Sequence, residues 1–313
     1  MKIILAPMEG VVDYTMRDLL TQVGGIDHCV TEFLRVSDRV LPAKVFRRMC
    51  PELMNGGKTP AGVPVILQLL GSDPSVLAGN ARKGAKLGAP GIDLNFGCPA
   101  KTVNKSKGGA VLLDTPELIH EIVKAVRQAV PQDVPVSAKM RLGNKDKELA
   151  IENAHAIAEA GADSLAVHAR TKLEGYKPPA HWEWISRIRE AVELPVIANG
   201  EVWNWQDYIR CKELSGCSDV MIGRGLVARP DLAKALKNQM VNRDSASLEW
   251  QHVLKLVLLY LNRIEQNLSA KYVHGRLKQW LFHLQREYVE ASVAFEKVKT
   301  IREPSQLRIA LTE

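Results

Sequence analysis

Cys98 is the residue in this sequence most clearly placed to take part in chemistry. It lies in the segment Asn95-Phe96-Gly97-Cys98-Pro99, directly after a short apolar run, and its glycine and proline neighbours interrupt regular structure there. Free cysteines are usually small hydrophobic core residues, and that interpretation suits the other cysteines of the chain. If the preceding run is a strand of a barrel, we therefore expect the Cys98 thiol to lie over the mouth of that barrel.

Polar side chains stand at the ends of most of the short apolar runs along the chain. A buried polar group costs free energy unless a partner or a ligand satisfies it. A polar, planar ligand that carries a phosphate would suit such a set. The residues at these ends, all polar except Met8 and Gly223, are Met8, Glu9, Glu32, Gln68, Asn95, Lys139, Arg141, His168, Arg170, Asn199, Glu201, Gly223 and Arg224.

These residues also have purely structural interpretations. Lys139 could be a surface lysine or half of a salt bridge, although the apolar strand around it favours an anionic partner. His168 could be an ordinary core histidine. Arg170 would lie on the same side of an extended strand as His168, however, and a second polar group there favours a functional role. Gly223 and Arg224 could form a simple turn, or could bind a phosphate through backbone N–H groups and positive charge.

The elements that would position these residues alternate between short apolar runs and amphipathic segments. Runs at residues 3–6, 29–33, 65–69, 92–95, 136–140, 164–168, 196–199 and 220–223 predict strands. Between them, Ile119, Ile122, Val123 and Val126 have the spacing of an amphipathic helix that begins near Pro116. Eight such units in about 240 residues predict an α/β fold, a (β/α)₈ TIM barrel with its site at the C-terminal ends of the strands.

A doubly wound open sheet is the alternative arrangement. It would ordinarily carry a G-x-G-x-x-G fingerprint after the first strand, where this chain has Ala6-Pro7-Met8-Glu9-Gly10. The nearest glycine-rich segment, residues 223–228, follows the eighth run instead, where a barrel commonly binds phosphate. The barrel therefore explains the glycines better.

Beyond Asn242 the apolar spacing is helical throughout. One stripe comprises Leu254, Val257, Leu258 and Leu261. A second comprises Val273, Leu277, Trp280, Leu281, Leu284 and Tyr288. We predict two domains, a barrel over residues 1–242 and a small all-helical domain over residues 243–313.

Composition narrows the class of protein. The chain has 313 residues, of which 46% are hydrophobic and 25% charged, as expected of a folded globular protein. Its formal net charge of +7 fits a polyanionic partner. Five cysteines without a C-x-x-C pair predict reduced thiols, a cytoplasmic location and no metal site. No apolar stretch predicts a membrane span or an export signal, and we expect a monomer.

Several segments, taken together and in order, resemble the tRNA-dihydrouridine synthases. The resemblance runs from residue 3 through the helical domain, and the combination of segments is far more specific than any one of them. The segments are Ala6-Pro7-Met8, Asn95-Phe96-Gly97-Cys98-Pro99, Gly108-Gly109-Ala110, Lys139-Met140-Arg141-Leu142-Gly143, His168-Ala169-Arg170-Thr171, Asn199-Gly200-Glu201 and Met221-Ile222-Gly223-Arg224-Gly225.

The resemblance implies an FMN-dependent enzyme that reduces selected uridines of tRNA to 5,6-dihydrouridine, with NADPH as the source of electrons. By position, the isoalloxazine ring, ribityl chain and phosphate of FMN would be bound by Pro7, Met8, Glu9, Gln68, Lys139, His168, Asn199, Gly200, Glu201, Gly223 and Arg224. The resemblance makes Cys98 the proton donor. Hydride would go from reduced flavin to C6 of uracil and the thiol proton to C5, while Lys139 would stabilise the negative charge on reduced FMN.

The same resemblance places the RNA. The target base must leave its stack to enter the barrel mouth, where Asn95 and Tyr176 would be its neighbours. Similarity is greatest to subfamily C, which acts on position 16 of the D-loop. The signs are Arg35 and the helix around Arg276; against this, a solvated helix face would carry the same charges. The residues expected to contact tRNA are Arg35, Asn95, Lys101, Arg141, Tyr176, Arg276 and Lys278.

One departure from the family pattern lies in the loop after Cys98, where Lys105 and Lys107 stand in place of smaller residues. Two other functions remain open at this point. Another FMN barrel oxidoreductase acting on a small dihydropyrimidine would share Lys139 and the phosphate loop but would not need the helical domain. A non-catalytic RNA-binding barrel would have no use for flavin and would be colourless.

Overall fold

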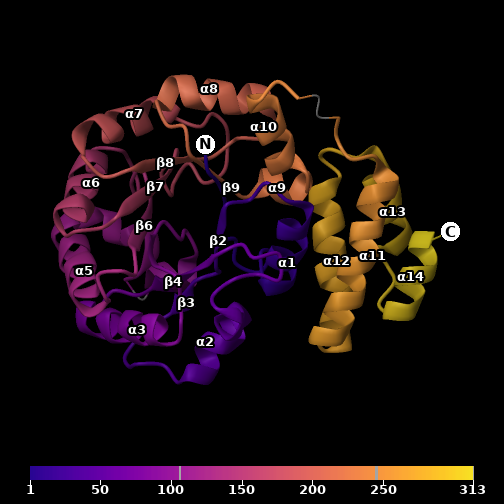
Figure 1. Ribbon diagram of the computed structural model, residues 1–313, viewed down its shortest axis with the longest axis horizontal. Helices are drawn as coiled ribbons and strands as arrows, with labels where there is room; N and C mark the ends of the chain where they lie inside the picture. Colours follow the sequence, from indigo (N-terminus) through magenta and orange to yellow (C-terminus); the bar gives the residue numbers. More distant parts are fainter. Residues whose placement is uncertain (106, 244–245, 313) are drawn as a thin grey trace.

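The structure is a computed structural model that describes residues 1–105, 107–243 and 246–312, and of Lys105 only the backbone. Ser106, part of the predicted lysine-rich loop, lies outside the described residues. Parallel strands form a closed barrel with helices around it, and further helices follow on one side (Figure 1). The predicted α/β fold, a TIM barrel followed by C-terminal helices, is therefore confirmed.

The barrel is closed by pairing between its second and third strands. In the described residues the sheet order is β2-β1-β9-β8-β7-β6-β5-β4-β3, and an additional β2–β4 pairing joins the two ends. The short strand β3 pairs only with β4 and is not one of the eight barrel strands. The strands are β1 (Ile3–Leu5), β2 (His28–Val30), β3 (Leu34–Arg35), β4 (Val65–Leu70), β5 (Ile92–Phe96), β6 (Val136–Arg141), β7 (Ser164–His168), β8 (Val196–Asn199) and β9 (Val220–Ile222).

The second predicted strand, residues 29–33, was wrong in its extent. The strand ends at Val30, and the chain then forms the separate strand β3 from Leu34. The side chains in between form bonds that a continuous strand would not allow. The Thr31 hydroxyl accepts a hydrogen bond from the Gln68 N–H, and the Glu32 carboxylate accepts one from the Gly10 N–H. The hydrogen bonds of the Thr31 and Glu32 side chains thus accompany the end of β2, although the apolar run continues to Phe33 in the sequence.

Local sequence signals explain where several of the outer helices begin. The side chains of Asp13, Asp73 and Asn204 each accept a hydrogen bond from a backbone N–H in the first turn that follows. Thr115 occupies the same position before Pro116 but makes no such bond. The helices up to the end of the barrel are α1 (Tyr14–Val23), α2 (Ala43–Met49), α3 (Pro74–Lys86), α4 (Lys101–Lys105), α5 (Pro116–Ala129), α6 (Ala150–Glu159), α7 (Trp182–Ala191), α8 (Trp205–Ser215), α9 (Arg224–Ala228) and α10 (Leu232–Met240), with 3₁₀ helices η1 (Pro51–Asn55) and η2 (Gly109–Asp114).

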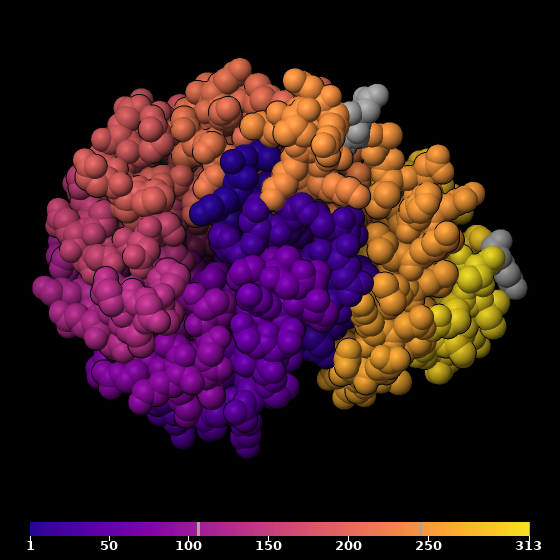
Figure 2. Space-filling model, in the orientation of Figure 1, coloured from indigo at the N-terminus to yellow at the C-terminus, as the bar shows by residue number. Residues whose placement is uncertain are grey.

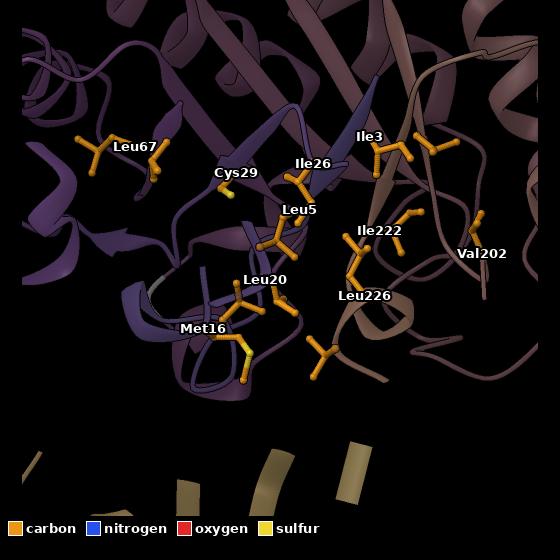
Figure 3. Close-up of a cluster of buried hydrophobic side chains, with 14 of the residues drawn as sticks. Ile3, Leu5, Met16, Leu20, Ile26, Cys29, Leu67, Val202, Ile222 and Leu226 are labelled. Atoms are coloured by element: carbon orange, nitrogen blue, oxygen red, sulfur yellow. The ribbon is translucent and has the colours of Figure 1, made fainter. Parts of the chain in front are cut away.

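The main hydrophobic core fills the space between the barrel and its helices. Figure 3 shows part of it, where Leu5 of β1 and Ile222 of β9 lie near Leu20 of α1 and Leu226 of α9. A much smaller apolar cluster fills the barrel interior and consists of Ile4, Ala6, Val30, Ala166 and Met221. Ile66 and Ile197 pack against this cluster, and polar side chains lie nearer the C-terminal ends of the strands, where a site can form.

The C-terminal helices pack together beside the N-terminal part of the barrel (Figure 1). In Figure 2 their orange surface meets the indigo surface of the first residues. Two contacts across this junction are an ion pair between Arg263 and Asp18 and a hydrogen bond from the Trp280 indole to the Val227 carbonyl oxygen. These helices are α11 (Trp250–Asn267), α12 (Ala270–Leu284), α13 (Val289–Val298) and α14 (Pro304–Thr312).

The apolar stripe predicted along the second of these helices is buried, from Val273 to Leu284. Of the stripe predicted for the first, Val257 and Leu261 are buried while Leu254 and Leu258 are only partly so. None of the helices described here combines the length and apolar character needed to cross a membrane.

Candidate active site

A cavity of about 640 Å³ opens at the C-terminal ends of the barrel strands. This is a usual size for the site of a small molecule or cofactor. All the residues predicted to bind the cofactor line it, and so do Cys98, Asn95, Lys101, Arg141 and Tyr176. Residues spread over more than two hundred positions of the sequence thus meet in one cavity, because they lie near or beyond the C-terminal ends of strands of the same closed barrel.

Three polar side chains of neighbouring strands form the centre of the cavity wall. Lys139 of β6 donates a hydrogen bond from Nζ to Oδ1 of Asn199 of β8 at 3.0 Å. The same oxygen lies 3.2 Å from Nδ1 of His168 of β7. The Asn199 amide in turn donates to the Met221 carbonyl oxygen at 2.7 Å, which fixes its orientation. Lys139 is therefore neither a surface lysine nor, among the described residues, part of a salt bridge.

Burial controls the charge of this group. Burial, and secondarily the nearby Arg141, lowers the pKa of Lys139 to about 8. The pKa of His168 falls well below its ordinary value because of burial and three neighbouring cations. His168 is thus neutral at pH 7, and its Nε2 atom is buried without a hydrogen-bond partner among the described residues. An ordinary core histidine would have both ring nitrogens satisfied, so this atom favours a missing ligand.

Glu201 holds two arginines at one end of the cavity. Its carboxylate forms ion pairs with Arg224 and with Arg170, the latter at 3.0 Å. Burial alone would raise the pKa of Glu201, but a hydrogen bond from Trp203 and the two guanidinium charges lower it. Both Nη atoms of Arg170 are buried without a properly oriented hydrogen-bond acceptor. Arg170 is fully buried and does not line the cavity, so Arg224 is the guanidinium that an anion in the cavity could reach.

The Cys98 loop is held by its backbone on both sides of the thiol. Asn95 Oδ1 accepts hydrogen bonds from the N–H groups of Gly97 and Cys98, both at 2.9 Å. The Cys98 carbonyl oxygen accepts from the Ala110 N–H and from the Asn104 side chain, both at 3.1 Å. Burial raises the pKa of Cys98, so the thiol is protonated at neutral pH. It is therefore available as a proton donor inside the cavity.

Aromatic rings and arginines alternate around the rim of the cavity. The guanidinium of Arg286 lies 3.6 Å from the ring centre of Trp203, and that of Arg224 lies 5.1 Å from the rings of both Trp203 and Tyr176. The guanidinium of Arg141 also lies 5.1 Å from the ring centre of Tyr176. Trp203 was not predicted as a site residue, although its place two residues after Glu201 could have indicated it.

A family model and curated relatives match this chain over nearly its whole length. The model described as dihydrouridine synthase matches residues 4–311. The chain belongs to this family. The tRNA-dihydrouridine(16) synthases of Aquipseudomonas alcaligenes and Pseudomonas putida are each 55% identical to it, over 96% and 99% of this chain and 95% of each relative. That of Neisseria meningitidis serogroup B is 49% identical over 100% of this chain and 94% of its own.

Solved structures resemble this dihydrouridine synthase family member in fold. A 2-naphthoyl-CoA reductase in complex with 2-naphthoyl-CoA has a TM-score of 0.57 at 14% identity, covering 77% of this chain and 50% of its own. A variant of NCR from Zymomonas mobilis has a TM-score of 0.53 at 13% identity, covering 76% and 86%. The resemblance to the dihydrouridine synthases that the sequence motifs carry is confirmed by the family match.

Three residues predicted to contact tRNA in this family member lie outside the cavity wall. The Arg35 guanidinium donates to the Thr102 carbonyl oxygen at 3.1 Å. Arg276 of α12 pairs with Asp13 at 2.6 Å and donates to the Gly10 and Val11 carbonyl oxygens. It thereby ties the helices to the loop after β1.

Lys278 donates to the carbonyl oxygens of Lys299 and Ile301, and so braces the C-terminal helices. Arg286 lies beyond the last residue of α12, Leu284, in the turn that follows the helix. This turn places the Arg286 guanidinium over the ring of Trp203 at the cavity rim.

Proposed function

We propose that this protein reduces a uridine in the D-loop of tRNA, at position 16, to 5,6-dihydrouridine, with FMN as cofactor and NADPH as reductant. The observation that carries the proposal is that a protonated thiol, Cys98, shares one cavity with the Lys139, Asn199 and His168 cluster. Family membership and the names of the relatives support it. We further propose that the protein acts as a monomer in the cytoplasm.

The residues of the cavity fit FMN. Pro7, Met8, Gln68 and Lys139 would hold the ring, and the free Nε2 of His168 offers the buried polar contact that a ligand would satisfy. Gly223 lines the cavity with its backbone alone and has no room for a side chain, since a Cβ there would lie 2.8 Å from the Met8 sulfur. When bound, FMN supplies the hydride that reduces uracil and regains it from NADPH.

Glu201 is best suited to an indirect role at the phosphate end. A carboxylate repels a phosphate, whereas the two guanidinium groups that it pairs with attract one. We assign Arg224 to the phosphate, and we assign Glu201, supported by the buried Arg170, to the orientation of Arg224. Lys139, mostly protonated below its pKa of about 8, would stabilise negative charge on the reduced ring system.

Cys98 would deliver the proton. Addition of a hydride at C6 of uracil leaves a carbanion at C5 that is stabilised as an enolate, and the Cys98 S–H gives its proton to C5. The resulting thiolate recovers a proton from solvent. The raised pKa of Cys98 keeps the thiol in the donating form before the reaction and makes the thiolate a strong enough base to be reprotonated after it.

The rim would receive the RNA. Tyr176, which is exposed and lies between Arg141 and Arg224, offers a stacking surface for an extruded base, and Asn95 lies deeper in the cavity. Lys101 is exposed at the cavity mouth. We propose that Arg35, Arg276 and Lys278 add contacts to phosphates, and that residues 1–242 form the FMN-binding domain and residues 243–313 a tRNA-binding domain.

Mass-spectrometric mapping of dihydrouridine in unmodified tRNA incubated with the protein and NADPH tests this function. We expect a yellow protein, with absorption near 450 nm, that modifies position 16. The variant Cys98→Ala should retain FMN and form no dihydrouridine. A colourless protein would favour RNA binding without catalysis. Bound FMN with turnover of a free dihydropyrimidine, and none of tRNA, would favour the small-molecule oxidoreductase.

A further inference from the structure

A buried carboxylate, Asp93, lies beneath the cavity and has no role in the chemistry above. It belongs to β5, two residues before Asn95, so the two side chains point to the same side of the strand, into the barrel. Asp93 is only 2% exposed and does not line the cavity. A carboxylate so deeply buried costs free energy unless its bonds serve the structure around it.

Hydrogen bonds connect Asp93 to the Cys98 loop through two amides. Asp93 Oδ2 accepts from Gln68 Nε2 at 2.7 Å, and Gln68 Oε1 accepts from Asn95 Nδ2 at 2.8 Å. Asn95 Oδ1 then accepts from the Cys98 N–H at 2.9 Å. The other carboxylate oxygen of Asp93 accepts from the Ser137 hydroxyl at 2.6 Å. All members except Ser137 are buried.

The carboxylate makes this chain run in one direction. Burial raises the pKa of Asp93, while the hydrogen bonds from Ser137 and Gln68 and the charge of Lys139 favour its ionised form. In that form Asp93 only accepts hydrogen bonds, so the Gln68 NH₂ group faces Asp93 and its oxygen faces Asn95. The Asn95 NH₂ group then faces Gln68, which leaves the Asn95 oxygen for the backbone N–H groups of Gly97 and Cys98. Removing the acceptor at position 93 would leave a buried N–H of Gln68 unpaired and free the amide to turn.

We propose that Asp93 is a positioning residue that acts through Gln68 and Asn95 to hold the Cys98 thiol in place for proton transfer. This inference rests on the proposed function for the role of the thiol. Asp93 touches neither the cavity nor, on this assignment, the substrate. Its effect through Asn95 should fall on the step that uses Cys98, whereas any effect through Gln68 on the flavin ring would fall on the reduction of FMN by NADPH.

Two variants at position 93 separate the hydrogen-bond acceptor from the charge. Asp93→Asn removes the charge but keeps an oxygen for Gln68, since its NH₂ group can face the Ser137 hydroxyl, which both donates and accepts. Asp93→Leu has a similar size and removes the acceptor. Any influence of the carboxylate charge on Lys139 is lost in both variants, so a difference between them reports the acceptor alone.

Anaerobic stopped-flow absorbance at the flavin band measures both half-reactions in the FMN-loaded protein. In Asp93→Leu, reoxidation of the reduced flavin by tRNA should slow about ten- to a hundredfold, the cost of a misplaced reacting group. Reduction by NADPH, which does not use Cys98, should slow less than reoxidation does in the same variant. Asp93→Asn should reoxidise within about threefold of the wild-type rate.

Alkylation of Cys98 gives a readout that does not depend on catalysis. Cys98 is 8% exposed, whereas the other cysteines are at most 2% exposed, so iodoacetamide labelling located by mass spectrometry should report chiefly on this thiol. We expect a changed labelling rate in Asp93→Leu and an unchanged one in Asp93→Asn. If Asp93→Leu does not retain FMN, Asp93→Ala removes the same acceptor without bulk.

Wild-type rates of reoxidation and labelling in the variant that lacks the acceptor would overturn the inference, and so would an equal loss in Asp93→Asn. Failure of the proposed function looks different, because the wild-type protein itself would then form no dihydrouridine. In that case the labelling comparison still decides whether Asp93 positions Cys98.

Discussion

Gly109→Ala should disturb Cys98 more than any other single methyl group added to the loop that follows it. Gly109 has φ +69°, a left-handed conformation that costs other residues about 1–2 kcal/mol. An added Cβ would lie 2.7 Å from the Cys98 carbonyl oxygen and 3.1 Å from the Cys98 Cβ. Since non-bonded heavy atoms prefer about 3.5 Å or more, the loop must move by roughly 0.5–1 Å.

That movement would weaken the hydrogen bonds that the Cys98 carbonyl accepts from Ala110 and Asn104. With ~1 kcal/mol for a weakened bond, the total loss of stability is about 2–3 kcal/mol. For a chain of 313 residues such a loss corresponds to a fall in Tm of roughly 3–5 °C. A displacement of this size at a reacting group can lower the rate of dihydrouridine formation about a hundredfold.

The assay compares Gly109→Ala with its neighbour Gly108→Ala by thermal unfolding and by dihydrouridine formation at saturating NADPH. Gly108 has φ −111°, which any residue adopts, and its added Cβ would approach only the Leu70 and Val103 side chains and the Val103 carbonyl oxygen, at 3.3 Å or more. We expect this control to remain close to wild type. Equal Tm values and equal rates in the two variants would refute the reasoning from backbone geometry.

Three further predictions concern charge and the rim. Because Lys139 has a pKa of about 8, its positive charge is present below that pH and lost above it, so FMN reduction by NADPH should slow as the pH rises through about 8; Lys139→Met should be slow at every pH and show no such step. Arg276→Ala should cost about 1–3 kcal/mol of stability and so lower Tm, because it leaves Asp13 Oδ2 and two carbonyl oxygens without the donor that Arg276 provides. A variant with normal Tm and weakened tRNA binding would instead favour a purely RNA-binding role. Tyr176→Ala should raise the Kd for tRNA about tenfold through loss of stacking, as measured by filter binding, while Tyr176→Phe keeps the ring and should bind normally; equal effects in both variants would contradict stacking.

The barrel and most of the cavity could be predicted from sequence because both depend on local signals. Short apolar runs define the strands, and barrel closure then brings whatever follows each strand to one mouth. Lys139 and Asn199 were found in this way, although they are sixty residues apart. The prediction failed where a polar side chain ended a strand early, as Glu32 and Thr31 do after β2.

Contacts between distant segments could not be predicted. Arg276 was predicted to contact RNA from its charge and helical position, but nothing local shows that Asp13, 263 residues earlier, lies within 2.6 Å. The hydrogen-bond partners of Asp93 could not be predicted either, since a single aspartate in an apolar strand forms no recognisable pattern. Its role emerges only when the register places it opposite Gln68 on one side and Ser137 on the other.

Two amides of this cavity share one feature, which is that an acceptor on a neighbouring strand sets the orientation of the amide. Asp93 does so for Gln68, and the Met221 carbonyl oxygen does so for Asn199. With its NH₂ group held by Met221, Asn199 must present oxygen to both Lys139 and His168. The neutral amide thus satisfies the Lys139 ammonium without raising its pKa as a carboxylate would.

Asn199→Asp tests this reasoning on the pKa of Lys139. A carboxylate 3.0 Å from Nζ should raise that pKa by about 1 unit or more, since an opposite charge favours the protonated lysine. The fall in the rate of FMN reduction should then move from about pH 8 to higher pH. The same change places two acceptors 2.7 Å apart at Met221 and should cost about 1–3 kcal/mol of stability. An unchanged pH profile in a variant that still binds FMN would show that Lys139 does not set it.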